Sequence, residues 1–94
     1  MAMNEKLLYK IYVSGRVQGV GFRWNAAREA KSLGLKGFIK NLSDGRVYIE
    51  AEGTREQLNT FLEWCRKGPQ FSSVVSVESA SFPAVDYTEF SIEH

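Results

Sequence analysis

A glycine-rich segment followed closely by an arginine is the feature of this sequence best suited to chemistry. Residues 15–21 include Gly15, Gly19 and Gly21, and Arg23 stands two positions later. Glycines allow backbone N–H groups to converge on an anion, and unpaired N–H groups at a helix start add positive potential. Arginine offers a planar pair of donors that matches two phosphate oxygens. The segment predicts a phosphate-binding loop, while a plain tight turn beside a solvated arginine explains the same local pattern.

Two commoner nucleotide motifs are excluded by the residues around this loop. A P-loop ends in Gly-Lys-Ser or Gly-Lys-Thr, whereas Gly21 is followed by Phe22 and Arg23. A dinucleotide fingerprint needs a third glycine, and counting from Gly19 and Gly21 that position falls on Trp24. Neither ATP nor NAD is indicated, and we expect no cofactor.

Other reactive residue types are few. Cys65 is expected on the apolar side of a helix, where a thiol is buried and inert. His94 is the last residue, so we expect it to be mobile and no general base. Asp44 belongs to a predicted turn, which explains its type. No group of His, Cys or carboxylates has metal-ligand spacing, which argues against a metal-dependent phosphatase.

The elements that must position the loop follow from hydrophobic periodicity. Alternation predicts strands, and helical spacing of small and apolar residues predicts a helix that ends at Gly34. Thr54 opens a capping box for a second helix, which stops at Gly68 and Pro69. Asp44 and Gly45 predict a hairpin. The predicted strands cover residues 8–14, 35–42, 47–52, 74–82 and 89–93. The first predicted helix covers residues 22–33, and the second follows the Thr54 cap and stops at Gly68-Pro69.

This order predicts an α+β fold of the ferredoxin-like split βαβ type, β-α-β-β-α-β, in one domain over residues 1–94. Right-handed crossovers place both helices on one face of an antiparallel sheet. We expect Tyr12, Tyr48, Glu50 and Glu52 to lie on the other, more solvated face.

Composition limits the possible partners. Twelve Lys and Arg against eleven Asp and Glu give a net charge of +1, so no electrostatic footprint for nucleic acid or an anionic membrane is present. No apolar run has the length of a membrane span, and residues 1–6 lack the apolar core of a signal peptide. A single cysteine forms no intrachain disulfide. We expect a cytoplasmic protein.

The longer motifs identify a resemblance that covers nearly the whole chain. The sequence resembles the acylphosphatase family in three places: the run G-R-V-Q-G-V-G-F-R over residues 15–23, the run G-L-K-G-F-I-K-N over residues 34–41, and the later pairs Asp44-Gly45 and Gly68-Pro69. Two departures are Phe38, where the family commonly has tryptophan, and the less apolar Ser72-Ser73. They affect packing more than the predicted site.

The resemblance implies a ferredoxin-like hydrolase that cleaves the carboxyl–phosphate bond of acyl phosphates and releases inorganic phosphate. It implies that Arg23 binds the phosphate, that Asn41 positions the attacking water, and that the loop residues form the phosphate cradle. These loop residues are Gly15, Arg16, Val17, Gln18, Gly19, Val20 and Gly21. An acyl phosphate is already activated, so positioning and charge stabilisation suffice without a covalent nucleophile or a metal. We expect a monomer in which the water proton passes to the substrate phosphate.

Two other functions are compatible with the predicted fold. An RNA-binding module of the RRM type has the same element order, but the aromatic RNP pattern is missing and Glu50 and Glu52 share the sheet face with Tyr12 and Tyr48. A phosphate- or carbamoyl-phosphate-binding module without turnover is the second possibility, since the same fold occurs within larger hydrogenase-maturation proteins.

Overall fold

The computed structural model describes residues 5–94. Residues 1–4 lie outside the described chain, and with them most of the segment 1–6 for which the sequence predicts no signal peptide. The order of helices and strands is the predicted one. The elements are β1 (Lys6–Arg16), α1 (Phe22–Ser32), β2 (Lys36–Asn41), β3 (Val47–Thr54), α2 (Arg55–Lys67), β4 (Ser73–Pro83) and β5 (Phe90–Ile92). Within the described chain, no helix is long and apolar enough to cross a membrane.

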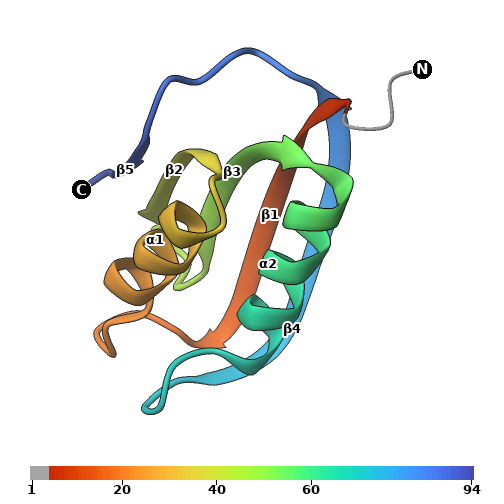
Figure 1. The fold of residues 1–94 in the computed structure, drawn as a ribbon. Helices are drawn as coiled ribbons and strands as arrows, with labels where there is room; N and C mark the ends of the chain where they lie inside the picture. Colours follow the sequence, from red (N-terminus) through yellow and green to blue (C-terminus); the bar gives the residue numbers. More distant parts are fainter. Residues whose placement is uncertain (1–4) are drawn as a thin grey trace.

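The strands form one sheet in the order β4-β1-β3-β2-β5. The four longer strands are antiparallel to their neighbours, and the short β5 pairs parallel to β2. Both helices lie on the same face of this sheet (Figure 1). The predicted ferredoxin-like split βαβ fold is confirmed, with β5 making the sheet mixed at one edge.

The core lies between the helices and the sheet. Alternate residues of β1 are buried there, and α2 contributes the apolar stripe that its sequence predicts, including Cys65. Burial raises the pKa of the Cys65 thiol, so this cysteine is an inert core residue. At the start of α2 the Thr54 hydroxyl accepts from the Gln57 amide at 3.2 Å, and the Gln57 side chain accepts from the Thr54 amide at 2.9 Å. This capping box was also predicted.

Figure 1 shows the connection between β4 and β5 arching from the end of β4 back to β5. The opposite face of the sheet is less solvated than predicted, because Glu50 and Glu52 of β3 bind residues of this connection. Glu52 is only 1% exposed, and its carboxylate accepts from the backbone amides of Val85, Asp86 and Tyr87. The expectation of a solvated Glu52 is therefore wrong. A buried carboxylate is tolerated here since three N–H donors replace its hydration.

Glu50, two positions before Glu52, binds the same connection through the side chain of Tyr87. Its carboxylate accepts from the Tyr48 hydroxyl at 2.5 Å and from the Tyr87 hydroxyl at 2.6 Å. Burial and the bond to Glu50 raise the pKa of Tyr87 to about 12. Together, Glu50 and Glu52 hold the segment that leads into β5.

Candidate active site

The glycine-rich segment begins as strand and only then becomes a loop. The sequence predicts Gly15 and Arg16 as part of the loop. In the structure β1 continues through Arg16, and both residues pair with β4 across a register shift. Gly15 has φ +125°, and a Cβ there would lie 2.2 Å from the Ser73 carbonyl oxygen. This close approach requires glycine. The loop proper covers residues 17–21 and leads directly into α1.

A cavity of about 230 Å³ opens beside this loop. It brings together five of the residues predicted from the sequence: Val17, Gly19, Gly21, Arg23 and Asn41. Gly15, Arg16, Gln18 and Val20 are not among its lining residues, which are Val17, Gly19, Gly21, Phe22, Arg23, Trp24, Asn41, Ile92 and His94.

The start of α1 is open to an anion. Gly21 occupies the N-cap in a left-handed conformation with φ +79°, no side chain caps this end, and the first turn holds no acidic residue. α2, in contrast, begins with a complete capping box and has Glu56 in its first turn. The uncapped N–H groups of α1 and the positive end of its dipole therefore face the cavity without a protein partner of opposite charge.

Arg23 is held by the end of the chain. Its Nη1 donates to the backbone carbonyl of Glu93 at 2.9 Å. No carboxylate of the described residues lies within 4.0 Å of its guanidinium. One fixed donor orients the group, and the others remain available for oxygen atoms in the cavity.

Asn41, the last residue of β2, presents an unsatisfied acceptor. Its Oδ1 is buried and has no hydrogen-bond partner, and no other buried side-chain atom of residues 5–94 shares this property. A buried polar atom without a partner costs about 1–3 kcal/mol, so such an atom is retained where a bound group satisfies it. Asn41 lines the same cavity as Arg23.

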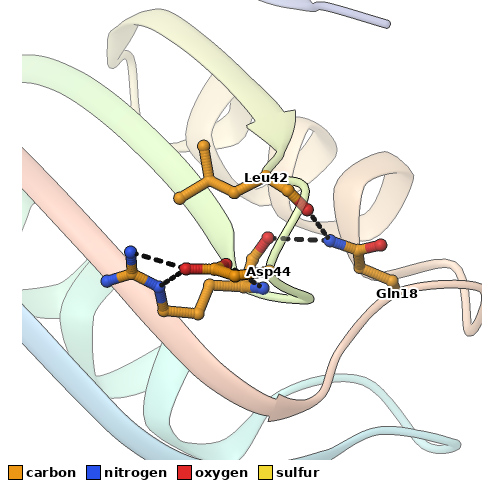
Figure 2. A network of polar contacts seen from close by, with 4 residues as sticks. Gln18, Leu42 and Asp44 are labelled. Carbon is orange, nitrogen blue, oxygen red and sulfur yellow. Dashed lines mark hydrogen bonds and ion pairs between the residues drawn. The ribbon is translucent and has the colours of Figure 1, made fainter.

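Gln18 fastens the loop to the hairpin that follows Asn41. Its Nε2 donates to the carbonyls of Leu42 at 2.8 Å and Arg46 at 2.9 Å, as Figure 2 shows. In the same hairpin Asp44 pairs with Arg46 at 2.8 Å, and the Arg46 amide holds the pKa of Asp44 below its usual value. The two carbonyl bonds couple the position of the loop to the end of β2, where Asn41 lies.

Four lining residues are absent from the site predicted from the sequence: Phe22, Trp24, Ile92 and His94. Trp24 follows Arg23, but its 60% exposure on the helix could not be read from the local pattern. Ile92 was predicted only as part of a short strand, and His94 was set aside as a mobile terminus. Since β5 pairs with β2, both residues are brought to the cavity by an element whose partner is distant in sequence.

The described residues contain no group of three or more His, Cys, Asp or Glu that could hold a metal ion. The positive charge in this cavity comes from Arg23 and from backbone N–H groups at the start of α1. The arrangement suits a small oxyanion such as phosphate, bound beside an amide oxygen that can orient a water molecule.

Comparison with known proteins shows the family of this chain. The family model described as Acylphosphatase matches residues 9–92. An acylphosphatase from Archaeoglobus fulgidus is 46% identical over 85 residues, covering 90% of this chain and 96% of that protein. The structure of an acylphosphatase from Coxiella burnetii has a TM-score of 0.92 at 34% identity and covers 99% of this chain and 100% of that chain. Full-length HypF, in a phosphate- and nucleotide-bound form, has a TM-score of 0.86 at 26% identity; the match covers 97% of this chain but 12% of that chain.

Proposed function

This chain belongs to the acylphosphatase family, and from that premise we propose that Arg23 and the loop hold the phosphate of an acyl phosphate while Asn41 orients the attacking water. Family membership makes the chain an enzyme that hydrolyses acyl phosphates. The residue roles, the absence of a metal requirement and the proton path are the content of the proposal.

Phosphate binding is supported by the charge of the cavity. The uncapped start of α1 and the Arg23 guanidinium are the positive groups at one end of it. The phosphate of an acyl phosphate carries two negative charges near neutral pH, and in the transition state the charge is spread over the three equatorial oxygens. Donors that are fixed before the reaction stabilise that charge without reorganising, as in other electrostatically assisted transfers. We therefore assign the phosphate to Arg23 and the loop amides, with no metal ion.

The unpartnered Oδ1 of Asn41 is the observation that carries the water-positioning role. In the proposed step the water oxygen bonds to phosphorus, the bond between phosphorus and the acyl oxygen breaks, and a carboxylate leaves. One water proton passes to a phosphate oxygen, so the enzyme needs no general base. A carboxylate is a weak base and leaves without protonation.

The remaining expectations complete the proposal: one domain over residues 1–94, acting as a monomer in the cytoplasm and releasing inorganic phosphate. The phosphate-binding module without turnover, which the sequence left open, does not fit the family membership, because that membership makes the chain an enzyme.

The test compares Asn41→Ala with Gln70→Ala, which removes an amide side chain at an exposed loop position outside the cavity. We expect Asn41→Ala to lower kcat for benzoyl phosphate about a hundredfold or more, because an unpositioned water loses much of its effective concentration. Inhibition by inorganic phosphate stays within a factor of two, since Arg23 and the loop are intact. The Asn41 Oδ1 makes no hydrogen bond within residues 5–94, so removing the side chain lowers the unfolding free energy by no more than about 1 kcal/mol.

Hydrolysis in ¹⁸O-labelled water adds an independent readout. The label enters phosphate if water attacks phosphorus, and it enters the carboxylate if water attacks the acyl carbon. Normal kcat in Asn41→Ala, or label in the carboxylate, contradicts the proposed roles.

A further inference from the structure

A second cavity of about 220 Å³ continues along α1 from the proposed phosphate site. Trp24 and Ile92 line both cavities, so the two are neighbours on the groove between α1 and β5. The remaining lining residues of the second cavity are Ala27, Arg28 and Lys31. The apolar floor and the two cations distinguish this cavity from the phosphate site, and the proposed mechanism uses neither cation.

The two cations lie on one face of the helix. Trp24, Arg28 and Lys31 stand at positions i, i+4 and i+7, which a helix places on the same side. Among residues 5–94 no carboxylate comes within 4.0 Å of Arg28 or Lys31. The Arg28 guanidinium lies 5.6 Å from the centre of the Trp24 ring, a distance at which the ring orients the cation.

The spacing along the helix fits the length of a small acyl group. With a rise of about 1.5 Å per residue, Arg28 and Lys31 lie about 7.5 Å and 12 Å beyond Arg23 along the helix axis. Long, flexible side chains bring their charges closer than these values. An acyl group of a few carbons that starts at the phosphate therefore reaches the two cations across Trp24 and Ile92.

We propose that this groove is the acyl subsite and that it selects acyl phosphates whose acyl group carries a second anion, a carboxylate or a phosphate, bound by Arg28 and Lys31. The inference rests on the proposed function, because it takes the reacting phosphate to lie against Arg23 and the loop. Trp24 and Ile92 cover the carbon chain, and the two cations contact the distal charge.

Lys31 also has an ordinary explanation, since a cation in the last turn stabilises a helix through its dipole. α2 supplies a matched control because Arg66 and Lys67 are exposed residues of its last turn and line neither cavity. The double variants Arg28→Ala/Lys31→Ala and Arg66→Ala/Lys67→Ala remove equal charge from the C-terminal halves of the two helices. A difference in activity between the two double variants therefore measures the contribution of the groove.

The experiment measures kcat/KM for benzoyl phosphate and for 3-carboxybenzoyl phosphate, which differ by one carboxylate. In the Arg28→Ala/Lys31→Ala variant we expect a five- to tenfold loss with the carboxylated substrate, about what two exposed charge contacts supply. Loss with benzoyl phosphate stays below twofold, as does loss with either substrate in the α2 variant. Salt weakens the selective effect, because exposed charges are screened.

The outcomes separate this inference from the proposed function. Equal losses for the two substrates, or equal behaviour of the two double variants, overturn the second-anion subsite while hydrolysis of benzoyl phosphate stands. Selectivity that depends on Arg28 and Lys31 supports it. A wild-type chain that hydrolyses neither substrate overturns the proposed function and this inference together.

Discussion

Replacing Gln18 with leucine tests whether the loop and Asn41 are positioned as one unit. The substitution removes two hydrogen bonds, of 2.8 Å and 2.9 Å, from the Gln18 side chain to the carbonyls of Leu42 and Arg46. Neither carbonyl is orphaned, because that of Leu42 still accepts from the Gly45 amide and that of Arg46 from the Leu42 amide. At about 1 kcal/mol for each neutral bond, we expect the unfolding free energy to fall by about 2 kcal/mol.

The same change should loosen the phosphate site. If the two bonds favour the binding-competent loop by about 2 kcal/mol, their loss raises KM by at most about 30-fold. We expect a rise of about five- to thirtyfold for benzoyl phosphate, with a similar rise in the inhibition constant of inorganic phosphate. Urea unfolding and steady-state kinetics give the two quantities. Gln70→Leu, at an exposed loop position, is the matched control. A stability loss below about 0.5 kcal/mol together with an unchanged KM would refute the reasoning.

Two further predictions concern the connection over the open sheet face. Glu52→Gln should lower the unfolding free energy by about 3 kcal/mol, because an amide supplies one acceptor oxygen where the buried carboxylate accepts three N–H groups. The control Glu78→Gln, at an exposed position, should change the unfolding free energy by less than about 0.5 kcal/mol. Similar urea midpoints for the two variants would contradict this prediction. Tyr87→Phe should destabilise the protein at neutral pH, and its deficit relative to wild type should shrink as the pH rises from 10 to about 12. The reason is that the folded-state pKa of Tyr87 is raised, so the stability that its protonated hydroxyl contributes is complete below pH 10 and is lost through about pH 12. A deficit that stays constant over that range, measured by urea unfolding, would contradict the contribution of Tyr87.

The fold was predictable because its local signals agree with one another. Helix and strand periods, the capping box at Thr54 and the Asp-Gly turn all specify the same order of elements, and the order limits the topology. The glycine-rich loop and Arg23 could likewise be singled out as a candidate anion site from residue types, since an anion site at a helix start is built from one continuous segment.

The rest depends on contacts between segments that are distant in sequence. Glu52 alternates with apolar residues like any solvated strand residue, and only the returning connection buries it. The local glycine pattern predicts that Gly15 belongs to a loop, and only its pairing with β4 shows that it is part of a strand. Trp24 and Ile92 reach the cavity because β5 pairs with β2 beside α1, which no local pattern specifies. The orphaned oxygen of Asn41 is likewise a property of the assembled site.

Hydrolysis of benzoyl phosphate in excess EDTA, by wild type, Arg23→Ala and Arg55→Ala, tests the central claim most directly. Arg55 is an exposed arginine at the start of α2 and controls for loss of the same side chain. The account predicts full turnover by wild type and Arg55→Ala, and a loss of kcat/KM of about 10²–10³-fold in Arg23→Ala with matching loss of phosphate inhibition. Activity that EDTA abolishes, or an Arg23→Ala variant within a few-fold of wild type, would contradict it.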